Sequence, residues 1–264
     1  MRPLADFPAA AADDISYVLT DIDGTLTREG RLPAATYGAL ERLQEAGLKV
    51  IPVTAGSSGW CDLIARMWPV DAVISENGGI YFYRVPTGAI ERRYWANAAE
   101  RREHKKRLRA VLGKAVRLVP GTAPSPDQHY REATLALTTI EGMLPSQGER
   151  VRLQALLREE KLHTTINSMW VLGWIGDFDK LAMTRRLMSE NFGIDIEREQ
   201  HRILYVGDSV NDEPMFGFFP HSVGVATVMR ELDQMASPPQ WITKGAGGDG
   251  FVEVADMLLQ CTER

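Results

Sequence analysis

Short apolar runs alternate with segments of helical periodicity in the first eighty residues. The runs SYVLT, LKVIPVT and DAVISENGG have the composition of buried strands. Two segments of helical spacing lie between them: residues 33–47, which begin with Pro33 and end at Gly47, and residues 58–68. This β-α-β-α-β order predicts a parallel sheet with right-handed crossovers, and hence an α/β domain with helices on both faces.

The pattern changes between residues 80 and 175. IYFYR, REATLALTTI and NSMWVLGWI predict strands, and in the second of them Leu135 and Leu137 share one face while threonines occupy the other. Two charged helical stretches separate these strands, at residues 97–115 and 146–160. We expect antiparallel strands with one face exposed to solvent, which indicates an α+β module.

The first pattern resumes after this module. DKLAMTRRLMSENFG predicts a helix, RILYVGDS a strand, NDEPMFGFF a short helix, HSVGVA a strand and GFVEVADMLLQ a last helix. We therefore predict a Rossmann-like, doubly wound parallel sheet as the core, formed by residues 1–79 and 176–264. The α+β module is inserted into this core at residues 80–175.

The bulk composition limits the class of protein. A formal net charge of −5 disfavours a general nucleic-acid binder. Cys61 and Cys261 are far apart in the sequence, so we expect neither a disulfide framework nor a zinc site built on cysteines. The N-terminal MRPLADFPAAAADD has no continuous apolar stretch, and no run of about eighteen apolar residues follows. We expect no signal peptide, no membrane contact and a cytoplasmic location.

Two carboxylates follow the first apolar run, in VLTDIDGTLT. Side chains two apart on an extended segment point the same way, so Asp21 and Asp23 face one site while Ile22 points into the core. In a parallel sheet this site lies at the carboxyl edge, where ligands bind. Two acids directed at one point repel each other unless a cation lies between them or one keeps a proton. The pattern predicts Mg²⁺, which prefers hard oxygen ligands.

A second acidic cluster, in YVGDSVND, has a similar arrangement. Asp208 ends an apolar strand, and Asn211 and Asp212 begin a helix. These acids are candidates to complete the metal site. For Asp212, helix capping at a strand–helix junction is an equal alternative.

Two further residues are suited to a phosphate group. Thr54 ends the strand LKVIPVT before Ala55 and Gly56, so its hydroxyl and the following N–H groups are candidate phosphate donors. Lys180 lies in the first turn of a helix, where the helix dipole disfavours a cation. An anion at the site explains this placement. The alternative is that the nearby Asp177 and Asp179 neutralise Lys180 at the surface.

Together these four motifs resemble the haloacid dehalogenase superfamily of phosphohydrolases. DIDGT, a Thr that ends the second strand, a Lys that opens a helix, and GDSVND occur in the order typical of that superfamily. The large insertion, preceded by ISENGG, resembles the subfamily with a C2-type cap, subfamily IIB, and WITKGAGGDGF resembles its sucrose-phosphate and mannosyl-3-phosphoglycerate phosphatase-like members. The sequence departs from many relatives in one place, because AGSSGW and not Gly-Arg follows the Thr.

The resemblance implies a role for each motif. Asp21 would be the nucleophile that forms an aspartyl-phosphate, and Asp23 the general acid and base. The implied Mg²⁺ site consists of Asp21, the backbone carbonyl of Asp23, Asp208 and, in a supporting position, Asp212. The implied phosphate-binding residues are Thr54, Lys180 and Asn211. Because a dehalogenase has no leaving oxygen to protonate, Asp23 favours phosphoryl chemistry.

We therefore predict a Mg²⁺-dependent phosphatase for a small phosphorylated metabolite, with a sugar phosphate as the expected substrate. A sugar phosphomutase has the same core motifs and is the alternative; it would return the phosphoryl group to the sugar and not to water. A non-catalytic binding protein is disfavoured because Asp21 and Asp23 are both present.

Three other features have two interpretations each. The basic run ERREHKKRLR, residues 100–109, is typical of a solvated helix face, with phosphate steering or a partner surface as alternatives. Trp170 and Trp174 are expected to pack between cap and core, with sugar stacking as the alternative. Glu76 and Asn77 either contact substrate or simply end a strand.

Overall fold

The computed structural model describes residues 1–167 and 169–262. Its largest sheet has six strands, and every neighbouring pair in it is parallel. In spatial order the strands are β1 (Arg2–Pro3), β13 (Trp241–Ile242), β12 (His221–Gly224), β11 (Ile203–Gly207), β2 (Tyr17–Thr20) and β3 (Lys49–Pro52). The prediction of a parallel α/β core is confirmed.

Helices cover both faces of this core sheet because alternate strand residues point to opposite sides. Val18 and Val50 belong to one apolar cluster, and their neighbours Leu19 and Ile51 to the other. The first face packs against α1 (Ala9–Asp14), α2 (Ala34–Glu45), α3 (Ser58–Met67) and α8 (Gly248–Thr262). The second face packs against α6 (Lys180–Leu187) and α7 (Glu213–Phe218).

A second, three-stranded sheet continues the core beside β3. It consists of β4 (Ala72–Ser75), β5 (Ile80–Arg84) and β6 (Ile90–Tyr94), and its two strand pairs are antiparallel. An isolated bridge between Val53 and Ile74 joins β4 to the end of β3. The pairing therefore places β5 and β6 next to the core, although they follow residue 80. The division into 1–79, 80–175 and 176–264 stays a prediction.

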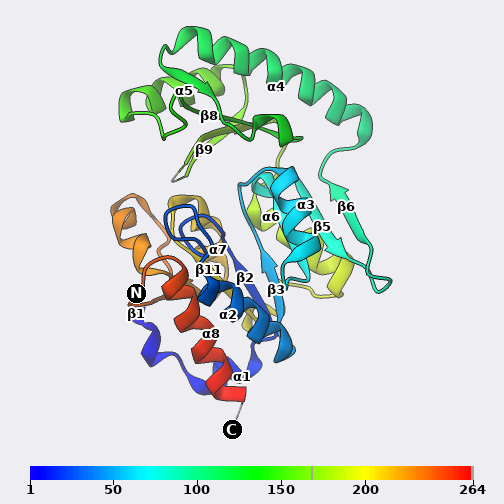
Figure 1. Ribbon diagram of the computed structural model, residues 1–264, viewed down its shortest axis with the longest axis vertical. Coiled ribbons are helices and arrows are strands. Elements are labelled where there is room, and N and C mark those ends of the chain that lie inside the picture. Colours follow the sequence, from blue (N-terminus) through cyan, green and yellow to red (C-terminus); the bar gives the residue numbers. More distant parts are fainter. Residues whose placement is uncertain (168, 263–264) are drawn as a thin grey trace.

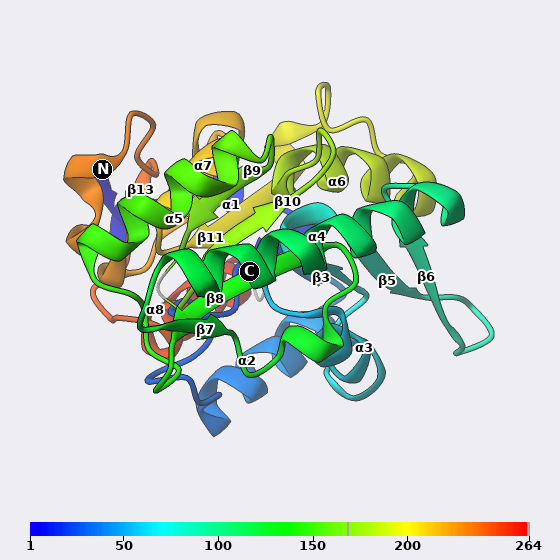
Figure 2. The ribbon, with the colours of Figure 1, turned by 90° about the horizontal axis from the view of Figure 1, so that it is seen from above.

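The cap is a four-stranded sheet covered by two helices. Its strands, in spatial order, are β7 (Thr122–Pro124), β8 (Thr134–Thr139), β10 (Val171–Trp174) and β9 (His163–Ile166), all antiparallel. Figures 1 and 2 show α4 (Ala98–Leu118) and α5 (Gln147–Glu159) side by side on the outer face, with the core beneath. Both helices begin with a capping box, at Asn97 and Ser146.

The face of β8 that was expected to be exposed to solvent is in fact covered. Leu135 and Leu137 share one face, as predicted, and pack under the helices, but β8 is buried along nearly its whole length. The other face contacts the core, where Trp170 and Leu172 pack with Ala55. The threonines of β8 alternate correctly, but the surface opposite them is protein and not solvent. Sequence polarity alone could not distinguish these two cases.

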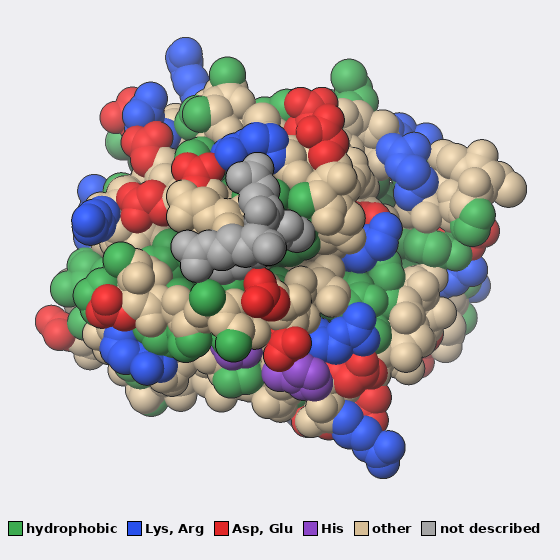
Figure 3. All heavy atoms as spheres, turned by 90° about the horizontal axis from the view of Figure 1, so that it is seen from below, with side chains coloured by type: hydrophobic (Ala, Val, Ile, Leu, Met, Phe, Trp, Pro, Cys, Tyr) green, Lys and Arg blue, Asp and Glu red, His purple; other side chains and the backbone are tan. Residues whose placement is uncertain are grey.

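Short helical turns complete the described chain. They are η1 (Leu4–Asp6), η2 (Glu76–Gly78), η3 (Gln128–Tyr130), the π-helical η4 (Met188–Phe192), η5 (Gln200–Arg202), η6 (Val210–Asp212), η7 (Ala226–Arg230) and η8 (Leu232–Gln234). Among the described residues, no helix has both the length and the apolarity needed to cross a bilayer. On the face that Figure 3 shows, acidic and basic side chains are interspersed.

Candidate active site

Three neighbouring core strands end at the same edge of the sheet, and each is followed by a predicted site residue. Asp21 follows β2, Asp208 follows β11, and Thr54 lies two residues after β3. The backbone N–H of Asp21 donates to the carbonyl of Val206 at 2.9 Å, which continues the pairing of β2 with β11. The parallel topology therefore brings residues almost two hundred positions apart to one edge.

Lys180 joins two of the predicted acids. Its ammonium group donates to Asp21 Oδ1 and to Asp212 Oδ1, both at 2.7 Å, and its side chain is 1% exposed. Burial alone would lower the lysine pKa, but the two carboxylates raise it above the ordinary value. The surface alternative is wrong: Asp177 pairs with His163, and Asp179 caps α6 by accepting from the N–H of Ala182.

Asp212 accepts hydrogen bonds from several groups at this edge of the sheet. Besides Lys180, Oδ1 accepts from the Tyr205 hydroxyl at 2.5 Å, and Oδ2 accepts from the backbone N–H groups of Asp208 and Ser209. It also closes a capping box with Ser209, so the capping interpretation is confirmed for this residue, while its part in a metal site stays a prediction. A carboxylate with this many donors is fixed in position and, through Asp208 N, positions the next acid.

Asp21, Asp208 and Asp212 form a group that fits a divalent cation. One oxygen from each lies within 4.8 Å of the others. Burial, and then the neighbouring carboxylates, raise the pKa of Asp208 well above its usual range. The pKa of Asp21 is raised to about 7, because burial and the repulsion of Asp212 and Asp23 outweigh the opposing effect of Lys180. A hard divalent cation relieves this repulsion.

Gly24 leaves the space that this arrangement requires. Its φ of +86° is unfavourable for residues with side chains, and an added Cβ would lie 2.3 Å from Asp208 Oδ2. The next residue, Thr25, donates its hydroxyl to Asp208 Oδ1 at 3.1 Å. The segment DGT, residues 23–25, therefore contacts Asp208 of the second acidic motif directly.

Asp23 lies within electrostatic reach of Lys180 and of the cap residues Arg131 and Asp127. Burial raises its pKa to about 6, while Lys180 and the cap residue Arg131 oppose the rise and Asp127 adds to it. A carboxyl group with this pKa exchanges a proton close to neutral pH, which suits a general acid and base.

Thr54 and Asn211 lie on the neighbouring segments, and neither side chain has a hydrogen bond to the acids in the described structure. Both are buried, and the Thr54 hydroxyl accepts from the Gly56 N–H at 2.9 Å, which leaves its own proton for a ligand. In the described structure the Asn211 side chain has no hydrogen bond. Both side chains therefore lie at the carboxyl edge without hydrogen bonds to the acids there.

Glu76 has a role that the sequence did not reveal. It is fully buried, and its carboxylate accepts from Ser58 N in the core and, at 2.8 Å each, from the N–H groups of Glu132, Ala133 and Thr134 in the cap. The Thr134 hydroxyl also donates to it. Its φ of +49° is a strained conformation for Glu. Glu76 therefore does more than end the strand, because its carboxylate joins the cap to the core.

A buried ion pair provides a second connection. Arg131 donates from Nε and Nη2 to the two carboxylate oxygens of Asp127, and from Nη1 to Ala55 O in the core at 2.9 Å. The guanidinium carbon lies 4.7 Å from the ring centre of Trp170. Trp170 therefore packs between cap and core, as predicted. No sequence signal distinguishes Arg131 from the many surface arginines of the cap.

The geometry matches solved structures over nearly the whole chain. A haloacid dehalogenase-like hydrolase from Bacteroides thetaiotaomicron superposes with a TM-score of 0.65 at 16% identity, covering 92% of this chain and 98% of that one. The chain has the haloacid dehalogenase-like hydrolase fold. The sucrose-phosphatase of Synechocystis sp. PCC6803, solved with sucrose and phosphate, has this fold as well and superposes with a TM-score of 0.61 at 14% identity, covering 92% and 97% of the two chains.

Sequence comparison gives a shorter match. A phosphoglycolate phosphatase from Methanospirillum hungatei is 42% identical over 69 residues, which are 24% of this chain and 28% of that relative. The chain thus matches less than a third of the relative's length. No protein-family model matches the chain.

Proposed function

We propose that this protein is a Mg²⁺-dependent phosphatase that hydrolyses a small phosphorylated metabolite through an aspartyl-phosphate at Asp21. The observation that carries the proposal is the buried group formed by Asp21, Lys180, Asp208 and Asp212 at the carboxyl edge. The names of the structural and sequence relatives support the same reaction class.

Asp21 is the nucleophile in this scheme. Its carboxylate attacks phosphorus, the bond from phosphorus to the leaving oxygen breaks, and Asp23 gives its proton to that oxygen. Water then attacks the phosphorus of the aspartyl-phosphate, transfers a proton to Asp23 and releases phosphate and Asp21. Lys180, already paired with Asp21 at 2.7 Å, holds the nucleophile in place and neutralises charge on the transferring group.

The proposed metal site consists of Asp21, the backbone carbonyl of Asp23 and Asp208. Asp212 would support it, because its oxygens are already held by Lys180, Tyr205 and backbone N–H groups. When bound, Mg²⁺ supplies charge neutralisation to the phosphoryl oxygens. Thr54 and Asn211, with their free hydrogen-bonding capacity, are proposed as further phosphate ligands.

We propose a sugar phosphate as the substrate, because a polar cavity lies between the cap and the core. A cavity of about 570 Å³ lies between β9 and α5 of the cap and the core segments at Val210 and Glu231. Amides and hydroxyls line it, among them Gln154, Thr164, Thr165 and Gln234. Such groups suit the hydroxyls of a sugar leaving group. Val210, which lines this cavity, directly precedes the proposed phosphate ligand Asn211.

The test is phosphate release from a panel of phosphorylated sugars, phosphoglycolate and phosphoglycerates, with and without Mg²⁺. Wild type should release phosphate only with Mg²⁺, and Asp21→Asn should lower kcat at least about 1,000-fold. The exposed Asp62→Asn is the matched control and should retain full activity. Isomerised sugar phosphate without phosphate release would indicate a mutase, and no turnover of any compound would contradict the proposal.

A further inference from the structure

A separate cavity of about 430 Å³ opens in the cap, between α4 and the segment that runs from Pro124 to Thr134. This volume is within the range of small-molecule sites. The cavity's lining includes none of the acids, nor Thr54, Lys180 or Asn211, although Arg131, which lines it, also acts on the pKa of Asp23. The question is which ligand its side chains would bind.

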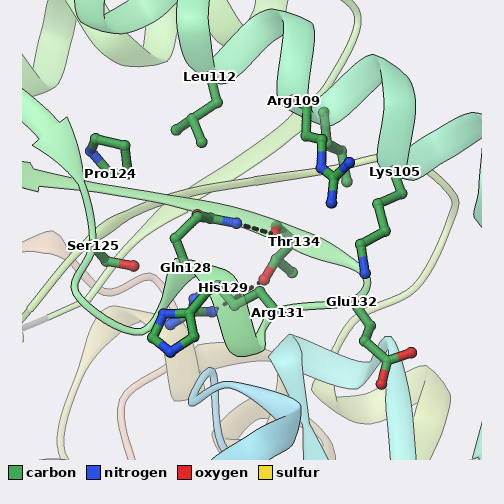
Figure 4. Close-up of a pocket in the computed structure, with 11 residues that line it drawn as sticks. Lys105, Arg109, Leu112, Pro124, Ser125, Gln128, His129, Arg131, Glu132 and Thr134 are labelled. Carbon is green, nitrogen blue, oxygen red and sulfur yellow. Dashed lines mark hydrogen bonds between the residues drawn. The ribbon is translucent and has the colours of Figure 1, made fainter.

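Two cations of the basic run reach into this cavity. Lys105 and Arg109 are four residues apart, so they lie on the same face of α4. Figure 4 shows both side chains extending from the helix toward the segment that carries Gln128 and Thr134. Neither has a hydrogen bond, ion pair or ring contact in the described structure. By contrast, Lys114 of the same helix pairs with Glu160. Both residues are exposed at the mouth of the cavity, where solvent screens their mutual repulsion and an anion between them would reduce it further.

The other charged residues at the cavity are already neutralised. The guanidinium of Arg131 is paired with Asp127 at 2.9 Å. The Glu132 carboxylate accepts from the Tyr94 hydroxyl at 3.0 Å and pairs with Arg92. The unbalanced charge of the lining therefore comes from Lys105 and Arg109 and is positive.

The remaining walls are apolar or rigid. Leu108 and Leu112 repeat the spacing of the two cations and form an apolar wall, with Pro124 opposite. The Gln128 amide is held on both sides, by donating to Thr134 O and accepting from Ala136 N. The floor of the cavity is therefore in place before any ligand binds.

We propose that this cavity binds a small organic anion, with its phosphate or carboxylate group on Lys105 and Arg109 and its apolar part against Leu108 and Leu112. Two sources share this chemistry: a free metabolite, or a second acidic group on a long substrate of the carboxyl-edge site. Lys105 and Arg109 belong to the basic run, residues 100–109, that the sequence predicted to be a solvated helix face.

The test is a calorimetric titration of the metal-free full chain with phenylphosphonate, whose phosphorus–carbon bond a phosphatase does not hydrolyse. The variant Lys105→Gln/Arg109→Gln should lose at least about tenfold in affinity. The control Arg102→Gln/Lys106→Gln changes two exposed cations of α4 that do not line the cavity, and should bind like wild type. Equal affinity in all three proteins, or no saturable binding to wild type at millimolar concentration, would overturn the proposal.

Kinetics then distinguish the two sources. If the anion belongs to the substrate, the double variant raises KM only for substrates with a second acidic group and leaves kcat unchanged. If it is a free metabolite, KM is unchanged for every substrate. Because the titration needs no turnover, a failure of the phosphatase proposal leaves the binding result interpretable.

Discussion

The carboxyl edge of the core and the junction between core and cap both bury charged groups, but they do so in different ways. At the junction, Glu76 has five hydrogen-bond donors, and Arg131 and Asp127 neutralise each other. At the edge, Asp21 and Asp208 repel each other and have raised pKa values. The junction is complete as it stands, whereas the carboxylates at the edge outnumber their one buried cationic partner, Lys180. Buried charged groups that have all their partners indicate a structural role, and buried charged groups that lack partners indicate a ligand site.

The largest effect on stability should come from breaking the ion pair at the junction. Arg131→Met leaves Asp127 buried without its partner and should lower the free energy of unfolding by about 3–5 kcal/mol. Urea denaturation measures this change. The double variant Arg131→Met/Asp127→Leu removes both charges and should recover most of the loss. If the double variant is no more stable than Arg131→Met, the loss came from packing against Trp170 and not from an unpaired charge.

A somewhat smaller loss is expected at Glu76. Glu76→Gln keeps the shape of the side chain but directs an amide NH₂ at backbone donors, so at least one donor loses its acceptor. The free energy of unfolding should fall by about 2–4 kcal/mol, measured by the same urea denaturation. Glu91→Gln is the control, because its pair with Arg93 is exposed and should contribute less than about 1 kcal/mol. Equal effects of the two substitutions would refute the role of Glu76 as a fastener.

The smallest effect on stability is expected at the carboxyl edge. There the removal of a charge should stabilise the protein, whereas at the junction it destabilises it. Folded Asp21 has a pKa of about 7 against an ordinary 3.8, so the folded protein holds a proton that the unfolded chain releases. The stability of the metal-free protein should therefore fall as pH rises from about 4 through about 7. Above pH 7, Asp208→Asn should raise the Tm of the metal-free protein by about 2–4 °C, because it removes one repelling charge.

Calorimetric unfolding at pH 5 and pH 8, with and without Mg²⁺, measures this effect. Mg²⁺ should raise the Tm of wild type more at pH 8 than at pH 5, and should have little effect on Asp208→Asn. If the metal-free wild type is equally stable at both pH values and does not respond to Mg²⁺, the carboxylates at the edge are as fully paired as the charged groups at the junction.

The same contrast explains what could be predicted from the sequence. Asp21, Thr54 and Asp208 end apolar strands, and Lys180 begins a helix, so local pattern and parallel topology were enough to place them together. Glu76 and Arg131 owe their roles to partners in the other part of the molecule, such as Thr134 and Ala55. Nothing in the local sequence marks such partners. The buried inner face of β8 was missed for the same reason, because the surface that covers it belongs to the core.

The central claim is that Asp21 accepts a phosphoryl group, and rapid-quench mass spectrometry tests it most directly. Protein mixed with Mg²⁺ and the best substrate of the panel is quenched in acid, digested and analysed for phosphorylation. We predict a phosphoryl group on the peptide that contains Asp21, which disappears on further incubation and does not form in Asp21→Asn. Turnover of the substrate with no phosphoryl group on Asp21 at any quench time, or with one on a different residue, would contradict the account.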